Sequence, residues 1–173
     1  GKVFHTTKKG VWDEMGAIAD YGPMAFNGKK STLHPSSPKG MAALGPLDAT
    51  FASLANVPNI QPTNDNPGYK GWRNTHWKTN SHFHYTDDNN RDLLTDEKSA
   101  EWLEKKIKDL QKEESKNPFF ISVGFIRPHT PLVVPQIFFD MFPIESVKIT
   151  TLKEDDIEDT KLAENTNKEP RGR

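Results

Sequence analysis

The most hydrophobic run in the chain is FFISVGFI, residues 119–126, and it stops abruptly at Arg127, Pro128 and His129. A strand that is apolar along its whole length has no face for water, so it belongs inside a parallel sheet that helices cover. The run therefore predicts a buried strand over 119–126. It also predicts an α/β fold that contains part of a mainly parallel sheet with a covering helix.

The covering helix is expected directly before this strand. Thr95 suits an N-cap position, and Asp96 and Glu97 are acidic residues suited to the first helical turn. Pro118 disfavours helical geometry in the residue before it, so the helix should end near that point. The pattern predicts a helix over 96–114. Its buried face is marked by apolar residues at helical spacing, namely Ala100, Leu103, Ile107 and Leu110.

A long loop-rich insertion is predicted over residues 20–92, which contain most of the prolines and glycines. It is too long for an ordinary connection, so we expect it to be packed covering. Its core should be a small aromatic cluster made by Trp72, Trp77, Phe83 and Tyr85. We expect one domain over 1–143, followed by a charged tail over 144–173 that continues into the rest of that domain.

The segment QIFFDMFP after the buried run is expected to form a helical turn. Its apolar side chains would pack inward: Phe138, Phe139, Met141 and Phe142.

Composition excludes several classes of partner. The chain has 23 Lys and Arg against 24 Asp and Glu, a net charge of -1, so no positive field favours nucleic acid. No stretch approaches the ~20 apolar residues of a membrane span. The chain contains no cysteine, which removes disulfides, thiolate metal sites and a cysteine nucleophile. At 34% hydrophobic residues the core is lean, as expected for an incomplete domain.

Polar residues end two predicted strands, and they are the first candidates for a site. The opening GKVFH supplies Lys2 and His5, and the buried run delivers Arg127 and His129. Ligands of open α/β sheets bind outside the carboxyl ends of the strands. These side chains can donate hydrogen bonds to a sulfate or phosphate, with an imidazole to pass a proton. The alternative is that they are strand-end residues paired with local carbonyls.

Two motifs resemble one enzyme family. GKVFH and, about 110 residues later, NPFFISVGFIRPHTPLVVPQIFFDMFP are similar to the central part of the iduronate-2-sulfatase-like sulfatases, within the alkaline-phosphatase-like superfamily. GPLDAT and the helix DEKSAEWLEKKIKDL fit the order of that group. The resemblance implies a hydrolase acting on sulfate esters of sugars or glycosaminoglycans, in a periplasmic, secreted or lysosomal location.

The resemblance also implies roles for individual residues. Lys2 and His5 match a lysine and a histidine that contact the catalytic aldehyde and the sulfate. His129 matches the histidine that contacts the sulfate near the leaving oxygen. Arg127 is expected to assist in binding the substrate.

Two further parts of the family's machinery have no match in this sequence. The formylglycine nucleophile derives from a C/S-x-P-x-R motif, whereas the nearest candidate, SSPKG, has Gly40 in place of the arginine. The calcium motifs of the family are also missing, because Asp87 and Asp88 belong to a turn-like DDNN. We therefore predict an internal fragment without metal ligands of its own, inactive alone, whose exposed sheet edges favour self-association.

Other interpretations stay open. His82 and His84, with Asp87 or Asp88, have the spacing of a zinc or copper site, although loop histidines are commoner. Aromatic residues interleaved with Lys70, Arg73 and Lys78 could stack on a sugar, which would make the chain a non-catalytic carbohydrate-binding or interaction module. The whole protein could instead be a phosphatase or phosphonate hydrolase of the same superfamily.

Overall fold

The computed structural model describes residues 3, 10–75, 81–112 and 118–151. The chain divides into two units, Gly1–Asp140 and Met141–Arg173. The first contains helices α1 to α3 and strands β1 to β8, and the second contains the short 3₁₀ helix η2 (Ile144–Ser146). None of the helices in the described residues has both the length and the apolar character needed to cross a membrane.

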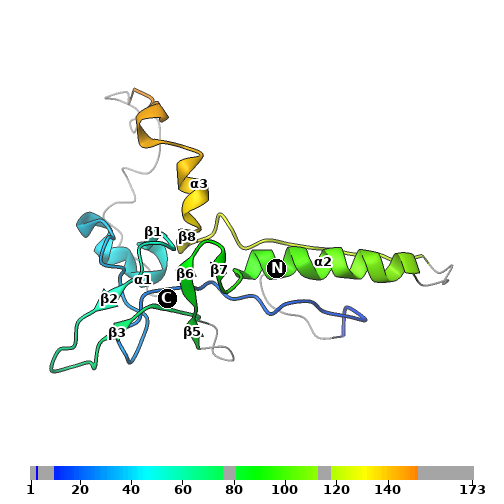
Figure 1. The fold of residues 1–173 in the computed structure, drawn as a ribbon, viewed down its shortest axis with the longest axis horizontal. Coiled ribbons are helices and arrows are strands. Elements are labelled where there is room, and N and C mark those ends of the chain that lie inside the picture. The colour runs from blue at the N-terminus through cyan, green and yellow to red at the C-terminus, as the bar shows by residue number, and fades with distance from the viewer. Residues whose placement is uncertain (1–2, 4–9, 76–80, 113–117, 152–173) are drawn as a thin grey trace, which may run out of the picture. The chain divides into compact units, whose positions relative to one another are not determined.

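The α/β class is confirmed, and the strands pair two by two. β1 (Phe51–Ser53) and β8 (Leu132–Val134) run parallel and side by side (Figure 1). The other pairs are antiparallel: β2 (Asn59–Ile60) with β3 (Tyr69–Lys70), β4 (Trp72–Arg73) with β5 (His82–Phe83), and β6 (Tyr85–Asp87) with β7 (Asn90–Arg91). The described part of the chain thus has a single parallel pair. Short strands joined by short connections favour antiparallel pairing, which explains the difference from the predicted sheet.

The hydrophobic core of the first unit surrounds the parallel pair. It consists of Ala52, Leu54, Trp72, Phe83, Leu94 and Val133, with Tyr85 packed against it. The Trp72 indole N–H donates to the Leu54 carbonyl at 2.8 Å, so the polar atom of this buried ring is satisfied. The predicted aromatic cluster is confirmed for Trp72, Phe83 and Tyr85, whereas Trp77 lies outside the described residues.

The predicted helix exists as α2 (Thr95–Lys112), but its buried face differs from the prediction. Thr95 and Ser99 are buried, whereas Ala100 is exposed and Ile107 is 40% exposed. The reason is that α2 does not rest on a sheet within the described residues. Its neighbours are two extended segments, 11–17 and 118–124, which line a groove together with Ser99 and Trp102.

Thr95 also differs from its expected role as the N-cap. It is the first helical residue, and its hydroxyl donates to the Asp20 carbonyl at 2.9 Å. The Glu97 carboxylate instead accepts the Leu94 N–H at 2.7 Å, which is one half of a capping box.

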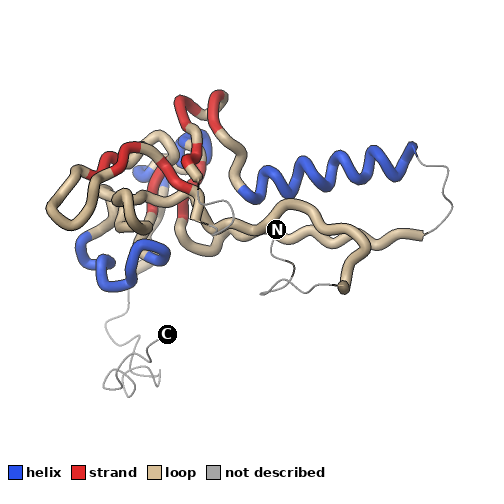
Figure 2. Tube along the Cα trace, turned by 90° about the horizontal axis from the view of Figure 1, so that it is seen from below, coloured by secondary structure: helices blue, strands red, loops and turns tan. Residues whose placement is uncertain are grey.

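The predicted strand over 119–126 is wrong. This segment is extended and runs alongside α2, as Figures 1 and 2 show, but it has no strand assignment. Only Ile126 is buried, and Phe120 is 78% exposed. A strand requires a neighbouring strand to form its ladder, and a helix cannot supply one. The nearest strand in sequence is β8, which begins at Leu132, beyond the histidine.

Two short helices precede β1, namely η1 (Lys39–Leu44) and α1 (Gly45–Asp48). The helical turn expected after β8 forms as α3 (Gln136–Asp140). Its predicted inward packing is wrong, because Phe138 and Phe139 are exposed, as are Met141 and Phe142 in the second unit. Five residues are too few to present a full apolar face.

Candidate functional site

The sequence RPH lies in a tight turn between the extended segment and β8. The His129 N–H donates to the Ile126 carbonyl at 2.9 Å, which closes a four-residue turn. The Arg127–Pro128 peptide bond within it is cis. Ile126 is buried, so the turn begins from a fixed point.

A carboxylate from α2 fixes the first half of this turn. Asp96 Oδ1 accepts the Ile126 N–H at 2.7 Å, and Oδ2 accepts the Arg127 N–H at 3.0 Å. Both oxygens are therefore used on adjacent backbone donors about 30 residues further along the chain. Charge-assisted hydrogen bonds of this kind are stronger than neutral ones.

The Arg127 side chain points into the protein. Its Nη2 donates to the carbonyls of Tyr21 and Gly22 at 3.2 and 3.4 Å. Burial lowers the pKa of the Arg127 guanidinium, while the carboxylates of Asp96 and Asp20 act in the opposite direction. An arginine remains charged under all ordinary conditions, so the turn carries a fixed positive charge.

His129 is oriented by two contacts. Its ring lies against the Tyr21 ring, with centroids 4.7 Å apart and planes inclined by 49°. Its Nδ1 is 2.7 Å from the Thr130 carbonyl, which can only accept, so Nδ1 carries the proton. In the neutral ring Nε2 is then the acceptor, and no hydrogen bond joins it to any of the described residues.

A second carboxylate fixes the far end of the turn. The Thr130 hydroxyl donates to Asp48 Oδ1 at 2.5 Å, and the Leu132 N–H donates to the Thr50 carbonyl at 2.9 Å as β8 begins. The histidine thus lies between two anchored points, one on α2 and one at the end of α1.

A cavity of about 270 Å³ adjoins the turn, between the start of α2 and α3. Its lining includes Asp20, Asp96, Arg127, Val134 and Phe138. The two aspartates are already engaged by hydrogen bonds, since Asp20 Oδ1 accepts from Gly22 and Thr75. The cavity therefore offers no free carboxylate from these two residues.

Two of the four predicted site residues, Arg127 and His129, lie within the described part of the chain. Arg127 and His129 share one turn, and both contact backbone carbonyls. Only the carbonyl beside His129, that of Thr130, is local, whereas Arg127 binds carbonyls more than 100 positions away. Lys2 and His5 lie outside the described residues, so their proximity to His129 stays a prediction.

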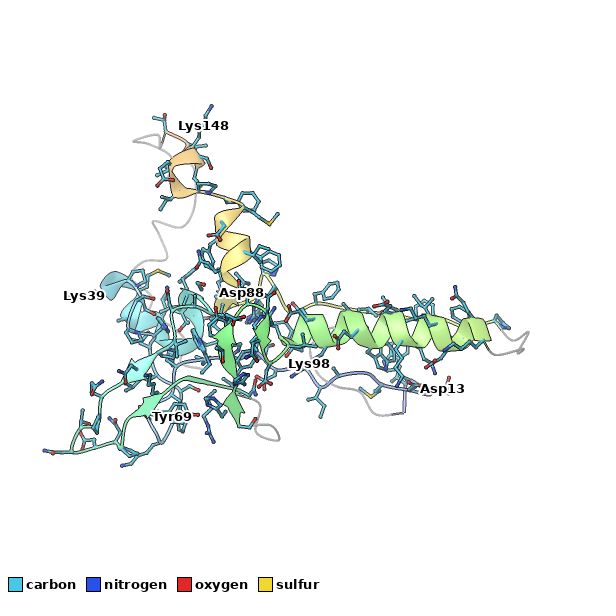
Figure 3. All side chains as sticks on the ribbon, in the orientation of Figure 1. Asp13, Lys39, Tyr69, Asp88, Lys98 and Lys148 are labelled. Carbon is cyan, nitrogen blue, oxygen red and sulfur yellow. The ribbon has the colours of Figure 1, made fainter. Side chains whose placement is uncertain are left out.

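The described residues do not form the alternative metal site. His82 Nδ1 is 2.7 Å from the Tyr69 hydroxyl, and His84 Nε2 is 3.2 Å from Asn90 Oδ1. Asp88 lies near the start of α3, where it accepts the Ile137 N–H at 3.2 Å (Figure 3). Within the described ranges no group of three or more His, Cys, Asp or Glu could bind a metal ion.

The aromatic loop is not a stacking platform built on Trp72 and Phe83, because both rings are in the core. Arg73 instead lies over the Phe26 ring, 4.6 Å from its centroid, and near the Tyr69 ring at 5.8 Å. Cation–π contacts within the protein account for this part of the basic and aromatic pattern.

Sequence reasoning missed the residues that orient the turn: Asp20, Tyr21, Asp48 and Asp96. Asp96 was recognised only as an acidic residue in the first turn of a helix. Its bonds to residues 126 and 127 depend on tertiary structure, and no local pattern signals them.

Comparison with known proteins gives two matches. A sulfatase of Formosa agariphila is 37% identical over 67 residues, which is 39% of this chain and 12% of the relative. An arylsulfatase of Clostridium perfringens is 40% identical over 38 residues, which is 22% of this chain and 8% of the relative. These matches support a sulfatase family. No protein-family model matches the chain, and no solved structure matches it.

The matched regions span about a tenth of the length of the two sulfatases. The two matches support the interpretation that the chain is a fragment of a sulfuric ester hydrolase. The iduronate-2-sulfatase-like subgroup and the kind of substrate stay predictions.

Proposed function

We propose that the chain is part of a sulfuric ester hydrolase of the iduronate-2-sulfatase-like group, that the substrate is a sulfated sugar or glycosaminoglycan, and that His129 contacts the sulfate. The observation that supports this role is the state of its ring. Nδ1 is bound by the Thr130 carbonyl, so Nε2 is left for a ligand. An imidazole fixed in this way can donate to a sulfate oxygen when protonated, or accept a proton when neutral.

The surroundings of His129 suit an anionic ligand. Arg127 places a positive charge two residues away, and its side chain is already bound to carbonyls, so it strengthens binding through its field. A direct contact between Arg127 and sulfate stays a prediction. Lys2 and His5 are proposed to complete the anion site.

The remaining chemistry has to come from residues other than those described. The resemblance implies that hydrolysis uses a formylglycine nucleophile and a calcium ion, and the motifs that would supply them have no match in this sequence. We propose that both are supplied by other parts of the whole protein.

The test uses the whole protein that contains these residues, assayed with 4-nitrophenyl sulfate and with 4-nitrophenyl phosphate. His129→Ala should lower kcat/KM for the sulfate ester by about 10²- to 10⁴-fold, because a proton-transferring or anion-binding group is removed. His84→Ala is the matched control and should retain activity.

Two results would contradict the proposal. Phosphate turnover that greatly exceeds sulfate turnover would favour a phosphatase. Equal activity of wild type and His129→Ala would remove His129 from the site.

A further inference from the structure

We propose that Asp96 is a positioning residue, which sets the location of His129 by binding the backbone of the turn that carries it. This inference rests on the proposed function of His129 for its catalytic consequence. The positioning itself can be tested without any activity.

The first step is the unusual use of an acidic residue near a helix start. Such residues ordinarily accept N–H groups of their own helix or interact with its dipole. Asp96 is the second residue of α2, yet the structure gives both its oxygens to the N–H groups of Ile126 and Arg127. The capping contact is made by Glu97, which binds the Leu94 N–H. Asp96 is therefore available for a tertiary contact.

The second step connects this contact to the histidine. Ile126 and Arg127 are the first two residues of the turn, and the Ile126 carbonyl accepts the His129 N–H at 2.9 Å. Fixing two consecutive peptide planes at the start of a four-residue turn fixes where its fourth residue lies. The position of the imidazole then follows from the position of the backbone, because Tyr21 and the Thr130 carbonyl orient the ring.

The third step is the fixed origin of the carboxylate. Thr95, the residue before Asp96, donates its hydroxyl hydrogen to the carbonyl of Asp20 at 2.9 Å, and Asp20 is buried. Ser99, one helical turn later, is also buried. Asp96 thus projects from a helix start that is itself anchored. An error of about 1 Å in a reacting group can cost on the order of 10²-fold in rate, so such anchoring has a catalytic effect.

The first experiment measures amide hydrogen exchange by NMR in the 173-residue chain. Asp96→Asn retains one oxygen acceptor but turns an NH₂ group toward the other backbone N–H. We expect exchange at Ile126 and Arg127 to accelerate by about tenfold or more relative to wild type. Asp109→Asn, on the same helix with only an ion pair to Lys112 at 3.8 Å, is the matched control and should leave both amides unchanged. Unchanged exchange at both amides in a folded Asp96→Asn chain would overturn the proposal.

The second experiment is a double-mutant cycle in the whole protein, read as kcat/KM for 4-nitrophenyl sulfate. Asp96→Asn should cost about tenfold in wild type and less than about twofold when His129 is already alanine, because the two residues act as a unit. An equal loss in both backgrounds would show a merely structural role and overturn the proposal. If His129→Ala has no effect on activity, the proposed function fails, and the exchange experiment alone decides the positioning.

Discussion

At the scale of single residues, His34 combines burial with a defined protonation state. It is 5% exposed, and its ring stacks on the core residue Trp72 with centroids 5.1 Å apart. The Ser36 N–H donates to Nδ1 at 3.1 Å, so Nε2 must donate to the Asn56 carbonyl, 2.7 Å away. The imidazole of His34 is therefore neutral in the folded chain.

The stability of the chain should depend on pH through His34. Burial lowers the pKa of His34 below 6.5, and the bond to Asn56 acts in the opposite direction. Below pH 6.5 the unfolded chain binds more protons at this site than the folded chain, so the free energy of unfolding should fall as the pH drops through 6.5 toward the folded-state pKa. Above pH 6.5 the contribution is fully present.

Urea unfolding between about pH 7.5 and 5 measures this dependence. His34→Gln, which can still donate to Asn56, should flatten the curve. A slope that survives in His34→Gln would assign the effect to other groups.

At the scale of elements, the features that depend on neighbouring residues in the sequence were predicted better than the features that depend on contacts between distant segments. The existence of α2 and its start at Thr95 followed from the spacing of apolar residues and from the acidic residues, because these act within the helix. The end predicted near residue 114 lies outside the described residues and stays a prediction. The buried face of α2 and the strand over 119–126 did not follow from such patterns, because each depends on what lies opposite. Parallel pairing between Phe51 and Leu132 joins segments 81 positions apart, and no periodicity specifies such a partner. The same holds for the candidate site. Arg127 and His129 could be recognised from their motif, whereas the role of Asp96 depends on tertiary contacts and could not.

The N-terminus of α2 should be stabilised by the contacts of Glu97. Its two oxygens bind Arg91 at 2.7 Å each, and one also accepts the Leu94 N–H. Burial alone would raise the pKa of Glu97, but the bonds from Arg91 and Leu94 outweigh it and lower that pKa.

Glu97→Ala should lower the free energy of unfolding by about 2 kcal/mol, because it removes the carboxylate partner of the Arg91 guanidinium and a helix cap. Urea unfolding at neutral pH measures the change. Glu104→Ala removes an exposed partner of Lys108 on the same helix and should change stability little. Similar losses in the two variants would mean that the Arg91 contact contributes no more than a surface pair.

At the scale of the whole molecule, exposed apolar side chains decide how the isolated chain should behave in solution. The extended segment beside α2 exposes Phe119, Phe120 and Phe125, and α3 exposes Phe138 and Phe139. Large apolar side chains that are exposed to water favour association between molecules where they gather in a patch. We therefore expect the isolated chain to self-associate. Assays at several chain concentrations would reveal this.

The 173-residue chain alone should not turn over sulfate esters, even with calcium supplied. Hydrolysis requires an activated nucleophile in line with the leaving oxygen, and donors without one can only bind the anion. The sequence contains no cysteine, and Gly40 stands where SSPKG would need arginine. Incubation with 4-nitrophenyl sulfate, with and without calcium, should release no more product than a Lys2→Ala, His129→Ala double variant. Multiple turnovers that disappear in the double variant would show that a nucleophile is present within these residues, and the assignment of the chain as a partial catalytic domain would then be wrong.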